Sequence, residues 1–100
     1  MAGAVRVMAA DKQLAVVRST FVEKVSIAVI GQLLDDLSED GVLNDLERES
    51  ILEQNSTRVD KARALIDTVK RKGDAPSARM IARLQSRDPA LYTLLDQTLA

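Results

Sequence analysis

From Thr57 to Gly73, the sequence TRVDKARALIDTVKRKG predicts an amphipathic helix with both of its ends marked. Thr57 is a residue type that caps helix N-termini, and Asp60 follows three residues later, where a reciprocal cap can form. Apolar residues from Val59 to Val69 recur with the 3.6-residue period and share one face. Three cations fill the last turn, where they suit the helix dipole, and Gly73 can adopt the left-handed conformation that ends a helix. Such a helix needs neighbours that cover its apolar face.

The composition predicts that those neighbours are also helices. The chain has 100 residues, of which 46% are hydrophobic and only 2% aromatic, so aliphatic side chains must fill one core. There is no cysteine, which excludes disulfides and thiolate catalysis. There is no histidine, so the commonest general base and the commonest zinc ligand are both missing. The residues therefore indicate no enzyme, no cofactor and no metal site.

Cap and turn signals elsewhere in the chain predict five more helices. Candidate caps precede four apolar runs, and a turn containing a proline precedes the fifth. The helices are expected after Asp11, after Ser26, after Asn44, after the turn Asp74-Ala75-Pro76-Ser77 and after Asp88. No run alternates long enough to predict a strand. We expect an all-α fold, an antiparallel bundle of six short helices, occupying residues 11–100 behind a flexible lead-in over residues 1–10.

The most apolar window, Leu14 to Leu34, does not predict a membrane span. It contains Arg18, Glu23 and Lys24, and burying these charges in lipid would be costly. The sequence therefore predicts a cytoplasmic protein without a transmembrane segment.

Charge is divided unevenly along the chain. The segment from Asp35 to Glu53 holds eight acidic residues and one basic residue, a net charge of −7. The segment from Arg58 to Arg87 holds nine basic and three acidic residues, a net charge of +6. Opposite poles on one small body can meet head to tail between molecules, and such a contact can propagate as a filament. The alternative is that both segments are ordinary solvated helix faces, with pairs such as Asp67 and Arg71 at i,i+4 spacing.

Several motifs carry a family resemblance that covers nearly the whole chain. They are Leu33-Leu34-Asp35-Asp36-Leu37, Val42-Leu43-Asn44, Asn55-Ser56-Thr57 and the run from Asp60 to Val69. Together they resemble a caspase recruitment domain (CARD), most of all the prodomain of inflammatory caspases of the caspase-one type. The resemblance implies a six-helix Greek-key bundle of the death-fold superfamily. It also implies homotypic interaction, in which an acidic surface on the second and third helices meets a basic surface on the first and fourth.

The resemblance and the charge pattern together assign two interaction faces. Asp35 and Asp36 match the acidic side of the family and Lys61 and Arg63 the basic side, while Asp40 and Asp45 are added from charge alone. The acidic face is predicted at Asp35, Asp36, Asp40 and Asp45, and the basic face at Arg18, Lys61 and Arg63.

The implied function is recruitment of an inflammatory caspase, or its adaptor, into an inflammasome-type filament in innate immunity and pyroptosis. The implied partners are other CARD-containing proteins and further copies of the chain. A caspase's protease chemistry would lie in another domain, because this chain has neither Cys nor His.

Three alternatives stay open. The chain could be the CARD of an adaptor or sensor protein. Its basic side could bind acidic lipid such as lipopolysaccharide. A stripe of Arg79, Arg83 and Arg87 could bind phosphate groups, although the acidic segment would repel a nucleic acid and few aromatic residues are present to stack on bases.

Overall fold

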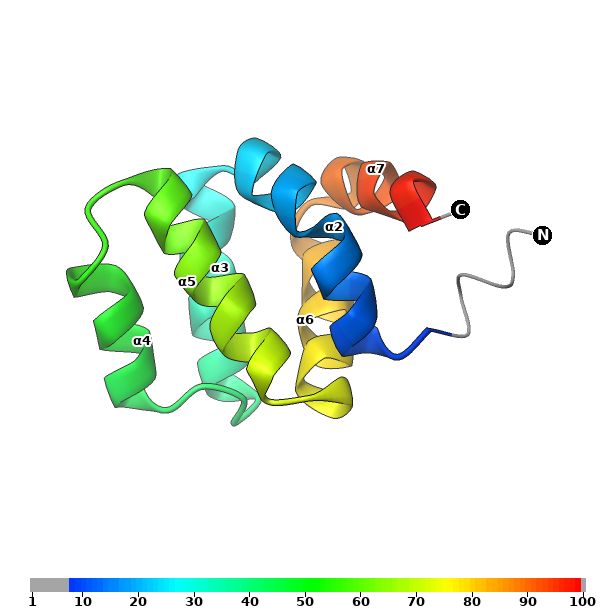
Figure 1. Cartoon of the computed structure of the whole chain (residues 1–100). Coiled ribbons are helices and arrows are strands. Elements are labelled where there is room, and N and C mark those ends of the chain that lie inside the picture. The colour runs from blue at the N-terminus through cyan, green and yellow to red at the C-terminus, as the bar shows by residue number, and fades with distance from the viewer. Residues whose placement is uncertain (1–7, 100) are drawn as a thin grey trace.

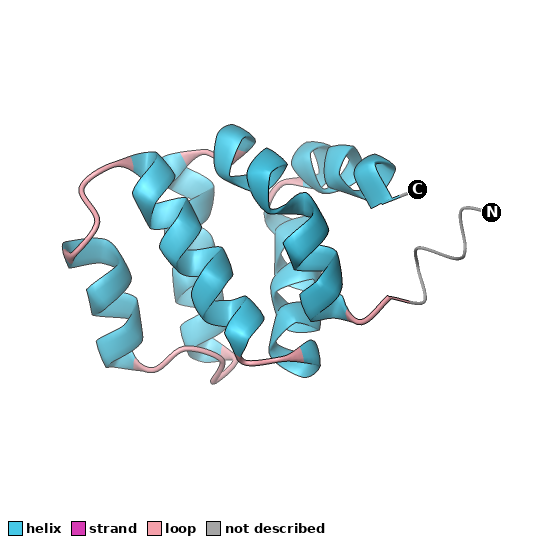
Figure 2. Ribbon diagram, viewed as in Figure 1, coloured by secondary structure: helices cyan, strands magenta, loops and turns pink. Residues whose placement is uncertain are grey.

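The computed structural model describes residues 8–99, and within them the chain forms six α-helices and no strand (Figure 2). The helices are α2 (Ala10–Lys24), α3 (Ile27–Glu39), α4 (Asp45–Glu53), α5 (Arg58–Arg71), α6 (Asp74–Arg87) and α7 (Pro89–Leu99). This confirms the all-α, six-helix prediction. Residues 1–7 of the predicted lead-in lie outside the described residues, and Ala10, its last residue, is already helical.

Side-chain caps begin most of the helices where the sequence predicts them. The Ser26 hydroxyl accepts a hydrogen bond from the Val29 N–H at the start of α3. Asn44 and Glu47 form a reciprocal capping box at the start of α4. Thr57 caps α5 and Asp88 caps α7 in the same way. Local hydrogen bonding therefore determines where these helices begin.

The start of α2 differs from the prediction. Asp11 lies inside the helix, and the N-cap is Ala9, which has no capping side chain. Instead, the Ala10 N–H donates to Asp74 Oδ1 at the start of α6, 2.7 Å away. A residue 64 positions away in the chain thus satisfies one of the free N–H groups of α2.

Two glycines with positive φ shape the connections. Gly41 follows α3 with a φ of 76°, and the bonds Gly41 N–H to Ser38 O and Val42 N–H to Leu37 O form a Schellman motif. Gly73 has a φ of 104° and a ψ of −161°, so it follows α5 in an extended conformation rather than the expected left-handed helical one. It is also the N-cap of α6, which starts at once. A side chain would strain the backbone at both positions.

Figure 1 shows how the helices pack around one core. α2 lies against α5, α6 and α7, and α3 lies against α5 and α6. α4 forms one edge of the molecule and, among the described helices, packs only on α3 and α5. The outer side of α4 is therefore uncovered.

The core is aliphatic, apart from Phe21 on α2. The predicted inner face of α5 is confirmed, because Leu65, Ile66 and Val69 are fully buried. In contrast, Leu46 on α4 has 78% of its surface exposed. No helix within residues 8–99 combines the length and the apolar character needed to cross a bilayer.

Candidate functional site

Acidic side chains of α3 and basic side chains of α6 form an internal network, named here the α3–α6 ion-pair cluster. Its members are Asp36, Asp40, Arg79, Arg83 and Arg87. Arg87 donates to both carboxylate oxygens of Asp36 at 2.7 Å. Arg83 donates to both oxygens of Asp40 at 2.8 and 2.5 Å, and Arg79 Nε lies 3.4 Å from Asp40 Oδ2. The two helices are thus joined by paired, bidentate contacts.

The cluster is shielded on its acidic side. The side chains of Asp36 and Asp40 are only 4% and 6% exposed. The hydrogen bonds from Arg87 hold the pKa of Asp36 below its usual range, and those from Arg83 do the same for the pKa of Asp40. Both carboxylates therefore stay charged at neutral pH and remain hydrogen-bonded to the arginines of α6.

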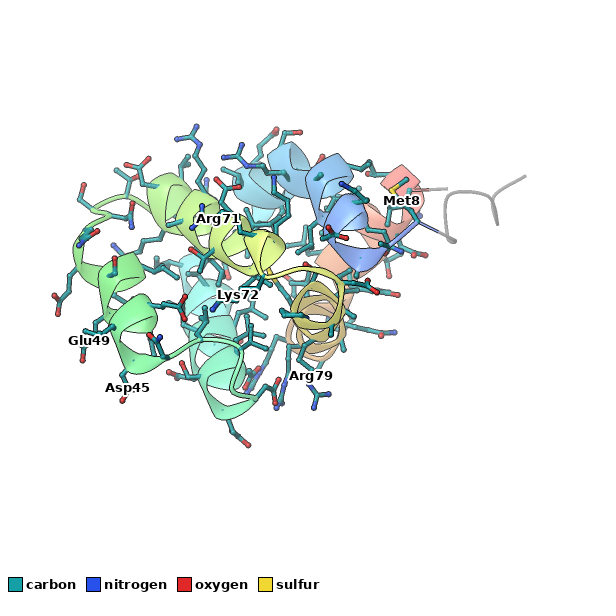
Figure 3. All side chains as sticks on the ribbon, turned by 60° about the horizontal axis from the view of Figure 1, so that its bottom comes forward. Met8, Asp45, Glu49, Arg71, Lys72 and Arg79 are labelled. Carbon is teal, nitrogen blue, oxygen red and sulfur yellow. The ribbon has the colours of Figure 1, made fainter. Side chains whose placement is uncertain are left out.

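These contacts correct two expectations from the sequence. Asp36 and Asp40 were assigned to an exposed acidic face, but they point at α6 and offer little surface to a partner. The stripe of Arg79, Arg83 and Arg87 was considered as a phosphate-binding face, but Arg83 and Arg87 are engaged with α3. The side chain of Arg79 is the most exposed of the three, at 58%, and Figure 3 shows it at the surface, while the side chain of Arg87 is 40% exposed. The i,i+4 spacing of both sets of residues is the sequence signal for this pairing.

The other two predicted acidic residues are on the surface. Asp35 is 65% exposed in its side chain and pairs with Arg48 of α4 at 2.7 Å. Asp45 opens α4 and is exposed, as is Glu49 one turn later. Figure 3 shows the side chains of Asp45 and Glu49 pointing away from the body of the molecule. The sequence counted Glu49 within the acidic segment but did not assign it to the interaction face.

On the basic side, Arg18 joins α2 to α5. Its guanidinium donates to both oxygens of Asp67 at 2.7 and 2.9 Å. These bonds lower the pKa of Asp67 and raise the pKa of Arg18. Asp67 therefore pairs across helices, and not with Arg71 at i,i+4 as the sequence suggested.

The remaining predicted basic residues make weaker internal contacts. Lys61 donates its ammonium group to the backbone carbonyl of Asn55 and contacts no carboxylate among the described residues. Arg63 approaches Asp60 at 3.2 Å, with its own side chain 52% exposed. An exposed pair of this kind contributes little to stability, so Arg63 remains available to a partner.

An open hollow of about 330 Å³ lies between α2 and α5 and brings two of the predicted basic residues together. This α2–α5 hollow is lined by Arg18, Ser19, Val22, Glu23, Arg58, Val59 and Arg63. Arg58 donates to the carbonyl oxygens of Val22 and Val25 at 2.7 and 2.9 Å, where α2 ends. Three guanidinium groups and one carboxylate thus surround a floor with two valines. The sequence did not single out Arg58, because its neighbours come from a distant segment.

One further cross-helix pair steadies α4. Lys72, just after α5, lies 2.9 Å from Glu47 Oε2. The Asn44 backbone N–H, followed by Lys72, keeps the pKa of Glu47 low. Glu47, the partner of Asn44 in the capping box, therefore also fixes α4 against the end of α5. No cluster of three potential metal ligands occurs in the part of the chain that the structure describes.

Comparison with known proteins identifies the family. The family model described as caspase recruitment domain matches residues 12–98. Caspase-1 of Equus caballus is 43% identical over 86 residues, which cover 86% of this chain and 21% of that protein. Caspase-1-A of Xenopus laevis is 47% identical over 72 residues, which cover 72% of this chain and 19% of that protein. Caspase recruitment domain-containing protein 18 of Homo sapiens is 38% identical over 82 residues, which cover 82% of this chain and 91% of that protein.

The matched segment spans about a fifth of the length of the two caspase-1 relatives. No solved structure matches the chain. With a family model covering most of its length and six helices packed around one core, the chain belongs to the caspase recruitment domain family.

Proposed function

We propose that this domain recruits an inflammatory caspase or its adaptor into a cytoplasmic signalling filament of innate immunity and pyroptosis. A caspase recruitment domain is a non-enzymatic domain that binds other domains of its kind. The filament, the caspase and the cellular setting are the proposal. It builds on the similarity to caspase-1 proteins and on the distribution of exposed charged side chains.

The observation that carries the proposal is the distance in the fold between the exposed acidic and basic groups. Asp45 and Glu49 lie on α4, at one edge of the molecule (Figure 1). The α2–α5 hollow lies where α2 ends and α5 begins, and α2 does not pack against α4. α5, which carries Arg58 and Arg63, packs on α4, but no ion pair among the described residues joins Asp45 or Glu49 to these arginines. One molecule therefore presents both partners of a charge-complementary contact without pairing them. A contact of this type is head to tail and need not close.

A charge-swap experiment tests this arrangement. Asp45→Lys and Arg63→Glu should each reduce self-assembly when present alone, because each places like charges across the contact. Mixing the two variants should restore assembly, because every contact between unlike copies again pairs opposite charges. Assembly is measured by light scattering and negative-stain electron microscopy, and folding by circular dichroism. Lys12→Glu, a charge change elsewhere on α2, serves as the matched control and should assemble normally.

Normal assembly of both single variants would contradict the proposed faces. Binding of acidic lipid at the basic hollow stays a second prediction, favoured by its three guanidinium groups. Lipid binding needs no acidic face, so Asp45→Lys would leave it unchanged while Arg63→Glu would weaken it.

A further inference from the structure

A small apolar cavity lies where α2, α6 and α7 meet. Figure 1 shows these three helices on the side of the molecule opposite α4. The free volume of the cavity is about 60 Å³, roughly twice the volume that one water molecule occupies in the liquid. Voids larger than a water molecule are few in protein interiors, because side chains pack there as densely as in an organic crystal. The cavity is therefore a departure from ordinary core packing.

Core side chains form the walls of the cavity. Each of the three helices contributes residues that are less than a tenth exposed. They include Val17 and Phe21 of α2, Met80 and Leu84 of α6, and Leu95 and Leu99 of α7. Such walls offer a water molecule no hydrogen-bond partner, and apolar cavities of this kind stay dry and accept apolar ligands.

Polar side chains lie at the rim of the cavity. Gln13 of α2 and Tyr92 and Asp96 of α7 also line it and are partly exposed, so they mark where it reaches the surface. The Gln13 Nε2 donates to the Met8 carbonyl oxygen at 2.8 Å, which holds this side chain in place. Among the described residues of the lining, Asp96 is the only charged one. Its carboxylate repels an anion, whereas amide and hydroxyl groups form hydrogen bonds with an uncharged group.

We propose that this cavity binds a small uncharged amphiphile, an alcohol with a short unbranched alkyl chain. The alkyl chain lies among Val17, Leu84 and Leu95, and the hydroxyl group lies at the rim beside Gln13 and Tyr92. Burial of the chain supplies the affinity, and the free volume limits the chain to a few carbon atoms. None of the lining residues belongs to the two interaction faces, so this inference does not depend on the proposed function.

Titration of the whole chain with n-butanol tests the site, followed by the methyl signals of isotope-labelled protein in NMR spectra. The signals of Val17, Leu84 and Leu95 should shift and saturate with a dissociation constant of about 1 to 10 mM, a value in reach of five non-hydrogen atoms. Sodium butyrate has a similar alkyl chain but a carboxylate head. It should bind at least about tenfold more weakly, because its charge must be desolvated beside Asp96.

A matched pair of variants locates the binding. Val17→Ile adds one carbon atom to the cavity wall and should weaken n-butanol binding by about tenfold, because less volume is left for the chain. Val16→Ile makes the same change one residue earlier, where the side chain is 47% exposed, and should bind n-butanol as the unmodified protein does. Circular dichroism checks that both variants fold.

A third variant enlarges the cavity. Leu99→Ala, at the end of α7, should let the cavity accept benzyl alcohol, which is too large for the unmodified protein. This variant tests the location even if Val17→Ile does not fold, because it changes the volume in the opposite direction.

Three results would overturn the inference. They are the absence of a saturable shift of the cavity methyl signals, equal binding of butyrate, and a ligand preference that neither Val17→Ile nor Leu99→Ala changes. Shifts spread over exposed methyl groups such as those of Leu46 would indicate non-specific contact with alcohol and would also count against the site. The charge-swap experiment should give the same result with and without n-butanol, so loss of this site leaves the proposed function intact.

Discussion

Two regions of this domain contain acidic side chains in different settings, one buried in ion pairs and the other exposed to solvent. In the α3–α6 ion-pair cluster, carboxylates that are about nineteen-twentieths buried meet guanidinium groups in bidentate pairs. On the outer side of α4, Asp45 and Glu49 are exposed and have no ion pair within residues 8–99. All four carboxylates belong to the segment that carries the net charge of −7.

The contrast shows that a charged segment is not the same as a charged surface. Asp36 and Asp40 satisfy their charge inside the molecule, so they hold α3 to α6 and contribute little to the outside. The charges of Asp45 and Glu49 are not paired within residues 8–99, so they are available to attract or repel an approaching molecule. A substitution in the first region should therefore change stability, and one in the second should change association.

Lowering the pH should have the largest effect on stability, because it protonates the carboxylates that are paired inside the molecule. The pKa values of Asp36, Asp40, Asp67 and Glu47 are all lowered in the folded state. Their contribution is therefore complete above the unfolded-state pKa of about 4 and is lost as the pH falls through the folded-state values. The melting temperature should stay level near neutrality and fall steeply below about pH 4. Thermal unfolding followed by circular dichroism measures this.

The double variant Asp36→Asn, Asp40→Asn provides the control for that titration. It should start with a lower melting temperature at pH 7 and lose less on acidification. An equally steep fall in this variant would place the acid sensitivity outside the cluster.

Removing one buried carboxylate should have the next largest effect. Asp36→Ala leaves Arg87 without its partner and should lower the free energy of unfolding by about 2 kcal/mol. The neighbouring change Asp35→Ala removes an exposed carboxylate and should cost at most about 0.5 kcal/mol. Urea denaturation measures both. Equal losses at the two positions would break the distinction between the buried and the exposed carboxylates.

Salt should separate the two regions without any substitution. Raising the ionic strength from about 0.05 to about 0.5 M shortens the screening length and should weaken assembly through the exposed faces. The melting temperature should change much less, because the buried pairs are screened less. Light scattering and thermal unfolding on the same samples compare the two effects. Assembly that is indifferent to salt would contradict an association directed by charge.

Changes on the outer side of α4 should have the smallest effect on stability. Asp45→Lys and Glu49→Lys should each alter the free energy of unfolding by no more than about 0.5 kcal/mol. Asp45 lies in the first turn of α4, where its carboxylate interacts favourably with the helix dipole. The loss of this interaction sets the size of the expected change in the free energy of unfolding. A loss as large as that of Asp36→Ala would show that α4 is structural and not a free surface.

Most of the fold could be predicted from the sequence because its signals are local. Ser26, Asn44, Thr57 and Asp88 cap helices through bonds that span three residues, and such bonds can be read from spacing alone. The stripe from Val59 to Val69 predicted a buried face, which the core confirms from Ala62 onward, while Val59 is partly buried. Asp11 failed as a cap because the start of α2 is bonded by Asp74, from a distant part of the chain.

The candidate site could be predicted only in part. The sequence located acidic and basic segments, and Asp45 and Arg63 are indeed exposed. It could not tell that Asp36 faces Arg87 and is buried while adjacent Asp35 is exposed. It also gave no role to Arg58, whose partners lie 33 and 36 residues away.

By itself, the sequence determined that this chain forms six helices, four of them begun by side-chain caps, with charge of opposite sign in two segments. The helical repeat of apolar residues and the hydrogen bonds of helix caps are set within a few residues, so they do not depend on how the helices pack. Only the tertiary structure decided which charged side chains form ion pairs inside the molecule and which stay exposed on its surface. That choice depends on which helix faces meet, and α6 reaches Asp36 and Asp40 while nothing in residues 8–99 covers Leu46, Asp45 and Glu49.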